Sequence, residues 1–306
     1  MSACNLCPRQ CGVNRLEGEL GFCRSGAQPV VSSFCAHHGE EPVISGTQGS
    51  GTVFFANCNM RCLFCQNFQI SQNWAAQQSN ITSVSALADV MLGLQTQGCH
   101  NINFVSPSHF VPQILQALEL AVPRGLKIPL VYNTNGYDAF ETLLELDGII
   151  DIYLPDLKYA DDKVSQKYSL TSDYVQVARS AIKEMFRQTG DLSLDANGLA
   201  VRGVIVRHLI LPNKLAGSHE TLTWLANQVS SNIAISLMSQ YHPLHMAYLH
   251  PEIGRRITRR EYDSVLETLY DSELENGWIQ DPQSAEDYLP NFNDTENPFE
   301  NKRPSP

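Results

Sequence analysis

The segment Asn57-Cys58-Asn59-Met60-Arg61-Cys62-Leu63-Phe64-Cys65 places three cysteines at the spacing C-x3-C-x2-C. Iron–sulfur clusters are held by cysteine thiolates, normally four of them. Three thiolates this close together can hold three corners of a cubic 4Fe-4S cluster and leave the fourth iron without a protein ligand. A zinc site and three unrelated thiols are the alternatives. We therefore predict a cluster with one open iron at Cys58, Cys62 and Cys65.

The chain around this segment alternates between β-rich runs and runs with helical spacing. Strands are expected at 52–56, 101–105, 128–132, 149–154, 203–211 and 233–238. Helices are expected at 84–97, 111–122, 139–146, 173–189, 220–230 and 259–276. Such alternation predicts an α/β fold with a parallel sheet and crossover helices. The cysteine loop directly follows the first strand, where a parallel barrel forms its active site.

The composition places limits on the class of protein. The 306 residues are 43% hydrophobic and 17% charged, which suits one large domain with appendages. No apolar stretch reaches the roughly 18 residues that span a bilayer, and the N-terminal residues Met1 to Cys4 do not resemble a signal peptide. The net charge is −11, without the basic cluster that nucleic-acid binding requires. We expect a cytoplasmic protein that binds neither membranes nor nucleic acid.

A second group of cysteines lies near the N-terminus, with the spacing C-x2-C-x3-C-x11-C. Its members are Cys4, Cys7, Cys11 and Cys23. Four thiolates around a glycine-rich spacer suit a structural zinc or an auxiliary iron–sulfur centre, and free surface thiols are the alternative. We expect a cysteine-rich metal-binding segment with a connecting arm at 1–50, a barrel at 51–280 and an acidic, proline-rich tail at 281–306.

The motif at Cys58, Cys62 and Cys65, with the aromatic Phe64 before its last cysteine, resembles the signature of the radical SAM superfamily. The resemblance implies a partial (β/α)6 barrel that binds S-adenosylmethionine (SAM) at the open iron. It also implies reductive cleavage of SAM to a 5′-deoxyadenosyl radical, with electrons from a low-potential donor such as flavodoxin or ferredoxin.

Further strings along the chain resemble an uncharacterised branch related to pyruvate formate-lyase activating enzymes. They are CNLCPRQCG (4–12), GELGFC (18–23), ISGT (44–47), NINFV (101–105), NTNG (133–136), DLK (156–158), RHLILP (207–212) and SLMSQY (236–241). The branch implies that the substrate is a glycyl-radical enzyme, whose backbone glycine loses a hydrogen atom. The alternatives are a small molecule, another protein residue, or a noncatalytic iron–sulfur or zinc protein acting in electron transfer or assembly.

The resemblance also implies contacts with SAM at strand ends. Asp156 and Lys158 follow the fourth strand and are expected to hold the amine or ribose and the carboxylate of SAM; a surface salt bridge is the alternative. At the third strand end, Asn133 replaces the aspartate of activating enzymes and can still form a hydrogen bond to SAM.

Where radical SAM enzymes often carry Gly-Gly-Glu, this chain has Ser106-Pro107-Ser108-His109. Ser106 and His109 are candidates for holding the SAM amine, or they only shape a turn.

Three further candidates complete the predicted site. Phe64 is expected to shield the cluster or lie near the adenine, and Gln240 to touch the adenine or pack in the core. Arg207 lies within an apolar strand and therefore needs a partner, which is either a SAM or substrate carboxylate or a carboxylate of the core. In the arm, His37, His38, Glu40 and Glu41 are predicted to form a solvated loop, with a second metal cluster as the alternative.

Overall fold

The computed structural model describes residues 1–281, 290–292 and 297–299, so most of the predicted tail lies outside the described residues. The strands are β1 (Val31–His37), β2 (Ser50–Phe55), β3 (Ile102–Val105), β4 (Leu130–Thr134), β5 (Ile152–Pro155), β6 (Ser193–Leu194), β7 (Ala200–Leu209), β8 (Ala234–Met238) and β9 (Gly277–Ile279). In the described part of the chain they form one sheet in the order β1-β2-β3-β4-β5-β7-β8-β9, with β6 paired to β7.

Strands β2 to β5 and β7 to β9 run parallel, whereas β1 lies antiparallel to β2 at one edge. All six predicted strands are present. The end strands β1 and β9 do not pair with each other, so the sheet is an open, partial barrel. The predicted α/β class and partial barrel are confirmed.

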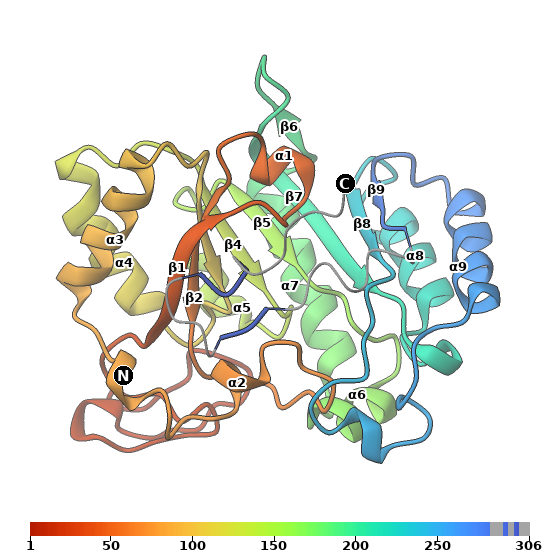
Figure 1. The fold of residues 1–306 in the computed structure, drawn as a ribbon, viewed down its shortest axis with the longest axis horizontal. Helices are drawn as coiled ribbons and strands as arrows, with labels where there is room; N and C mark the ends of the chain where they lie inside the picture. Colours follow the sequence, from red (N-terminus) through yellow and green to blue (C-terminus); the bar gives the residue numbers. More distant parts are fainter. Residues whose placement is uncertain (282–289, 293–296, 300–306) are drawn as a thin grey trace.

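The helices lie mainly on the outer face of this sheet (Figure 1). They are α1 (Pro42–Ser45), α2 (Phe68–Ser71), α3 (Val84–Thr96), α4 (Val111–Ala121), α5 (Phe140–Leu144), α6 (Asp162–Ser169), α7 (Tyr174–Thr189), α8 (Ser218–Gln228) and α9 (Arg259–Asp271). The main core packs their apolar faces against outward-facing strand residues such as Val53, Phe104 and Tyr132. None of the helices in the described residues has the length and apolar character needed to cross a bilayer.

A smaller core fills the inside of the barrel near the N-terminal ends of the strands. Ile44 of α1 is fully buried there against Val131, Ile152, Ile205 and Ala234. The arm that contains α1 therefore closes one end of the barrel interior. The interior is left open toward the carboxyl ends of the strands, where the cysteine loop lies.

Three strands, β1, β6 and β9, were not predicted from the sequence. Strand β1 arises from the supposed connecting arm, because its residues pair with β2 rather than cross solvent. Strand β9 begins at Gly277, whose φ is +133°, and a Cβ there would lie 1.9 Å from the Ile235 carbonyl oxygen. Only glycine allows this close approach. Because β9 has three residues and begins with a glycine, its sequence gives little strand signal.

The prediction of a solvated loop at the end of β1 was wrong for His37, Glu40 and Glu41, whereas His38 is exposed. His37 and Glu41 are buried, with 9% and 7% exposure. The backbone N–H of Glu40 donates to Ser45 Oγ at 3.0 Å, which fixes the turn into α1. The loop enters the barrel because its two carboxylates find a cationic partner inside the barrel.

Candidate active site

The carboxyl ends of the parallel strands surround a cavity of about 830 Å³. Nearly all the residues predicted to hold cofactors line it. They are Cys58, Cys62, Phe64, Cys65, Ser106, Asn133, Asp156, Lys158, Arg207 and Gln240. They come from the cysteine loop and from the ends of strands β3, β4, β5, β7 and β8. The fold thus brings side chains that are spread over 183 positions of sequence, from Cys58 to Gln240, around one cavity.

The cysteine loop begins where β2 ends. Asn57 has a left-handed φ of +68°, a conformation that asparagine tolerates better than most residues, and it turns the chain out of the sheet. Met60 is buried, and its backbone N–H donates to Cys58 Sγ at 3.3 Å. The loop is therefore held by the backbone turn at Asn57 and by the buried side chain of Met60.

Each of the three thiols is also contacted by a polar side chain from another segment. Asn135 Nδ2 donates to Cys58 Sγ at 3.3 Å, and Ser169 Oγ donates to Cys62 Sγ at 3.1 Å. Ser71 Oγ lies 3.2 Å from Cys65 Sγ. Such contacts suit thiolates that carry negative charge.

Burial and the neighbouring thiols raise the pKa of Cys58 to about 12 and that of Cys65 to about 11. Burial also raises the pKa of Cys62, against the lowering effect of Lys158. Thiolates in this place therefore need nearby positive charge, which metal ions supply.

In the described residues, no three His, Cys, Asp or Glu side chains converge closely enough to hold a single metal ion. A cubic cluster binds each thiolate at a different iron, and three thiols that line one cavity with side-chain donors fit that requirement.

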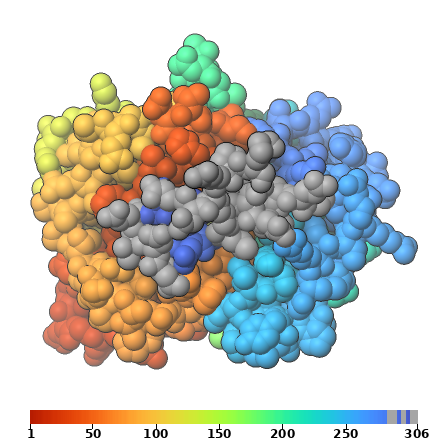
Figure 2. Space-filling view, viewed as in Figure 1, coloured from red at the N-terminus to blue at the C-terminus, as the bar shows by residue number. Residues whose placement is uncertain are grey.

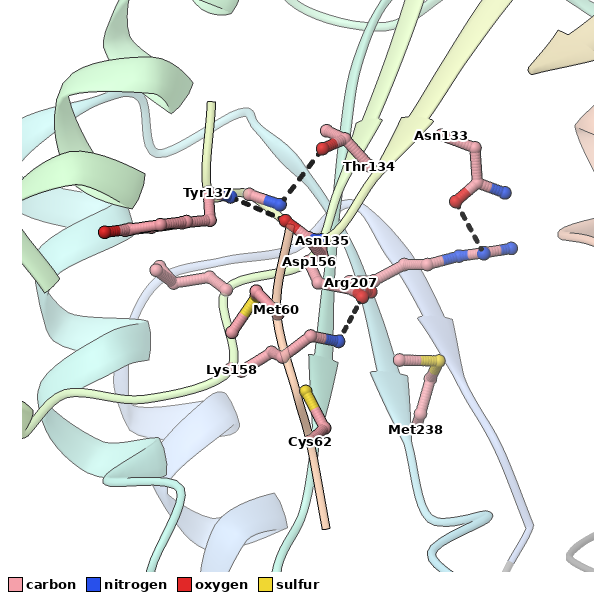
Figure 3. Close-up of polar contacts among 12 residues, drawn as sticks. Met60, Cys62, Asn133, Thr134, Asn135, Tyr137, Asp156, Lys158, Arg207 and Met238 are labelled. Atoms are coloured by element: carbon pink, nitrogen blue, oxygen red, sulfur yellow. Dashed lines mark hydrogen bonds and ion pairs between the residues drawn. The ribbon is translucent and has the colours of Figure 1, made fainter. Parts of the chain in front are cut away.

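Asp156 and Lys158 form an ion pair on the cavity wall (Figure 3). Their side chains are only 21% and 17% exposed, so the pair is not the surface salt bridge considered as the alternative. Burial alone would lower the pKa of Lys158, but Asp156 and Cys62 raise it above its ordinary value. The ammonium therefore stays charged beside the thiols.

The same strand end is fixed by Tyr174. Its hydroxyl accepts from the Lys158 backbone N–H at 2.9 Å and lies 2.9 Å from the Asn135 carbonyl oxygen. A fully buried ring thereby ties β5 to the loop after β4.

Arg207 has partners within the core. Its Nε and Nη2 donate to the two carboxylate oxygens of Glu41 at 2.8 and 2.7 Å, and Nη2 also pairs with Glu40. Asn133 Oδ1 lies 3.5 Å from Nη1. Burial lowers the pKa of Arg207, but the two carboxylates outweigh it and raise this pKa well above the ordinary value. Of the two partners considered for Arg207, a carboxylate of the core is thus present. The floor of the cavity holds two carboxylates, Glu40 and Glu41, and one guanidinium.

Ser106, Phe64 and Gln240 lie on other parts of the wall. Ser106 has a left-handed φ of +57°, a conformation that favours glycine, at the position where the family resemblance leads one to expect glycines. The Phe64 ring packs edge-on against Tyr241 with centroids 5.6 Å apart. Gln240 Oε1 accepts from Gln280 Nε2 at 3.2 Å.

His109 does not line this cavity. The Phe110 backbone N–H donates to the Pro107 carbonyl at 2.7 Å and closes a turn in which His109 is buried outside the cavity. There its Nε2 lies 2.9 Å from the Ala56 carbonyl oxygen, and burial lowers its pKa to about 3. The geometry separates His109 from the other residues predicted to contact SAM.

The N-terminal cysteines gather around a second, much smaller cavity of about 10 Å³, which His109 also lines. All four predicted ligands, Cys4, Cys7, Cys11 and Cys23, line it. A Cβ at Gly21 would lie 2.8 Å from Cys11 Sγ, so glycine permits the approach. Burial raises the pKa of Cys7 to about 12. Metal binding by these four thiols, and the identity of the metal, stay predictions.

The N-terminal segment also touches the cysteine loop. Arg9 Nε donates to the Asn59 carbonyl at 2.9 Å, and the guanidinium carbon lies 3.8 Å from the Phe22 ring centroid. Arg61 Nη2 donates to the Phe22 carbonyl at 2.8 Å. The two cysteine groups are thus neighbours, joined by arginines of both segments.

Several site residues were not predicted from the sequence. Asn135 lies in the quoted string NTNG, which was the one signal for it, whereas Ser71 and Ser169 lie in segments without any motif. Glu40 and Glu41 were assigned to a solvated loop. A described part of the C-terminal tail was also missed: Phe292 and Phe299 pack on Phe54 with centroids 5.4 and 5.8 Å apart. The described tail segments are the blue atoms among the grey ones in Figure 2.

Comparison with solved structures agrees with the fold. The chain is similar to the FeFe-hydrogenase maturase HydG from Carboxydothermus hydrogenoformans, with a TM-score of 0.52 and 12% identity. The match covers 78% of this chain and 55% of the maturase, so the chain spans about half of the maturase's length. The likeness shows the fold, an α/β partial barrel.

Comparison of sequences identifies a family. The chain is 30% identical over 269 residues to the uncharacterized protein MJ0674 of Methanocaldococcus jannaschii, which covers 86% of this chain and 73% of that protein. The chain belongs to the same family as MJ0674. No protein-family model matches the chain.

Proposed function

We propose that the chain is a radical SAM enzyme. The observation that supports this most directly is the position of Cys58, Cys62 and Cys65 on the wall of the same 830 Å³ cavity as Lys158 and Asp156. When bound, the cluster and SAM together supply a 5′-deoxyadenosyl radical that removes a hydrogen atom from a substrate. The noncatalytic alternative gives no reason for a large cavity with charged walls beside the thiols.

The residues of the chain have distinct parts in this proposal. The three thiolates would hold the cluster, and Lys158 would attract the carboxylate of SAM. Asp156 orients that ammonium and can accept a hydrogen bond from an amine or a ribose hydroxyl. Asn133 and Ser106 present further polar groups at neighbouring strand ends, while Phe64, backed by Tyr241, excludes water from the thiol side.

Anaerobic reconstitution with iron and sulfide tests the proposal. The reduced protein should convert SAM to 5′-deoxyadenosine, and Cys62→Ala should not. Cys99→Ala is a matched control, because Cys99 is buried in the main core and does not line the cavity. A cluster-loaded, reduced protein that binds SAM and never cleaves it would favour the electron carrier or assembly factor instead.

For the substrate, we propose a glycyl-radical enzyme, with flavodoxin or ferredoxin as the electron donor. The support is the resemblance of the strings at 4–12, 133–136 and 156–158 to activating enzymes. Incubation of the reduced enzyme and SAM with a candidate glycyl-radical enzyme should produce a glycyl doublet in the EPR spectrum. A doublet that forms equally well with Cys62→Ala would contradict this proposal.

One observation favours a second substrate class. The cavity floor carries Glu40 and Glu41 against the single guanidinium of Arg207, and the surplus carboxylate suits a substrate with an amine or guanidinium group. Such a small molecule or side chain should raise 5′-deoxyadenosine formation above the uncoupled rate. A Glu40→Gln variant should lose that stimulation while retaining the uncoupled rate.

A further inference from the structure

The hydrogen bond to Cys62 is the end of a longer chain of hydroxyl groups. Ser169 Oγ lies 3.1 Å from Cys62 Sγ and 2.6 Å from the hydroxyl oxygen of Tyr159. Tyr159 and Ser169 are both fully buried, with 0% exposure. The three groups form a continuous path from a tyrosine to a predicted cluster ligand.

The direction of this path follows from the charge on the sulfur. A thiolate ligand has no proton, so Ser169 must donate its single hydroxyl proton to Cys62. The Ser169 oxygen is then left to accept, and Tyr159 must donate to it. Donation by Tyr159 polarises the Ser169 hydroxyl and strengthens its hydrogen bond to the sulfur.

Backbone contacts hold Ser169 against the cysteine loop. The Arg61 N–H donates to the Ser169 carbonyl at 3.2 Å, and the Leu63 N–H donates to the Tyr168 carbonyl at 2.9 Å. These two bonds flank Cys62 in sequence, so the end of α6 and the middle of the motif form one rigid unit. The contact is therefore a fixed feature of the site.

Packing fixes the other end of the path. The Tyr159 ring lies edge-on to Phe64 and Tyr174, with centroid distances of 6.4 and 5.5 Å. Tyr159 directly follows Lys158, so the segment that carries the cavity cation also carries the hydroxyl behind Cys62. Neither Tyr159 nor Ser169 lines the cavity, which leaves both free of contact with SAM or substrate.

We propose that Tyr159 and Ser169 are positioning residues that set the reduction potential of the cluster through Cys62. Hydrogen bonds to cluster sulfurs are one of the means by which proteins adjust this potential. They stabilise the more negative, reduced cluster and so raise the potential. No proton moves along the path; the cluster accepts one electron from an external donor. This inference rests on the proposed function only in requiring a cluster at the three thiols.

The experiment is an EPR-monitored redox titration of reconstituted full-length protein without SAM, with dithionite as the reductant. Ser169→Ala should lower the equilibrium constant for reduction about tenfold, which is about 59 mV for a one-electron couple. Tyr159→Phe should shift the potential in the same direction by less, although Tyr159 does not touch the cysteine. Tyr168→Phe is the matched control and should leave the potential unchanged.

The double variant distinguishes a path from two separate packing effects. Once Ser169 is alanine, Tyr159→Phe should have no further effect on the potential, so the two changes should be strongly non-additive. Equal potentials in the parent protein and both single variants would overturn the inference, as would an undiminished Tyr159→Phe shift in the Ser169→Ala background.

Two further outcomes keep the conclusion separate from folding and from the proposed function. If Ser169→Ala fails to load iron, the shift in Tyr159→Phe decides the question, with Ser169→Thr expected to retain the parent potential. A parent protein with normal titration and no SAM cleavage would contradict the proposed function and leave this inference standing. A potential that Tyr159→Phe leaves unchanged, in a protein that cleaves SAM, would contradict this inference and leave the proposed function standing.

Discussion

The two cysteine groups of this protein share residue type and neighbourhood but differ in what surrounds them. Cys58, Cys62 and Cys65 open onto a cavity of about 830 Å³, whereas the four N-terminal cysteines enclose about 10 Å³. The larger cavity has an ammonium, a guanidinium and four carboxylates on its walls. The smaller is lined by the four cysteines together with residues of the same segment and His109.

If both groups bind metal as predicted, the difference distinguishes a site that admits a second molecule from one that only holds its metal. A ligand set with three thiols and adjacent space leaves room for another molecule at the metal, as catalytic metal sites do. Four thiols around a closed space leave none. A short segment such as residues 1–28 has too little apolar material for a core of its own, so a bound metal would stabilise it.

The largest contrast is expected from removing one thiol at each site. Cys62→Ser should abolish 5′-deoxyadenosine formation, because the cluster loses one of three ligands. Cys7→Ser should retain measurable SAM cleavage after reconstitution. Product formation by chromatography, normalised to iron content, measures both. Equal and complete loss in the two variants would mean that the N-terminal site takes part in the chemistry.

The cluster motif could be predicted because Cys58, Cys62 and Cys65 lie within eight residues of sequence. The strand ends could be predicted because buried parallel strands are continuous apolar runs. Asp156 and Lys158 follow directly from such a strand. Glu41 could not be placed, because its partner Arg207 lies 166 residues away and nothing in the local pattern links them. Ser169 is also remote from Cys62, at 107 residues.

The next effect concerns the cation of the open site. Lys158→Met keeps the length of the side chain and removes the charge, which leaves Asp156 without its partner. We expect SAM cleavage to fall about 10- to 100-fold, the range typical for residues that support a metal site. Iron content should stay at the parent value. Kinetics over a range of SAM concentrations should show most of the loss as a higher KM, and loss of iron instead would assign Lys158 to cluster assembly.

The closed site should show its role in stability. Cys7→Ser, compared with the parent protein by thermal denaturation monitored by circular dichroism, should lower Tm by several degrees. A loss of about 2 kcal/mol corresponds to roughly 4–8 °C for a chain of 150–250 residues, and somewhat less for this larger one. Metal analysis should show the loss of zinc, or of iron beyond the four of the open cluster. An unchanged Tm together with unchanged metal content would mean that the four thiols hold nothing.

The smallest effect tests the contact between the two sites. Arg9 joins them through its 2.9 Å hydrogen bond to the Asn59 carbonyl, next to Cys58, and through its packing on Phe22. Arg9→Gln removes the charge and the planar stacking group, and a hydrogen bond of this kind contributes about 1 kcal/mol. Because 1.4 kcal/mol is a factor of ten in an equilibrium, we expect a few-fold faster loss of cluster iron to a chelator.

Arg124→Gln, at an exposed ion pair with Asp89, is the matched control and should leave the rate of iron loss unchanged. If Arg9→Gln also leaves it unchanged, the two sites are neighbours without being coupled. If it speeds iron loss without changing the metal content of the N-terminal site, the closed site stabilises the open one through the backbone of the cysteine loop. That outcome would explain why a segment with its own predicted metal ligands lies directly beside the loop that carries the proposed cluster.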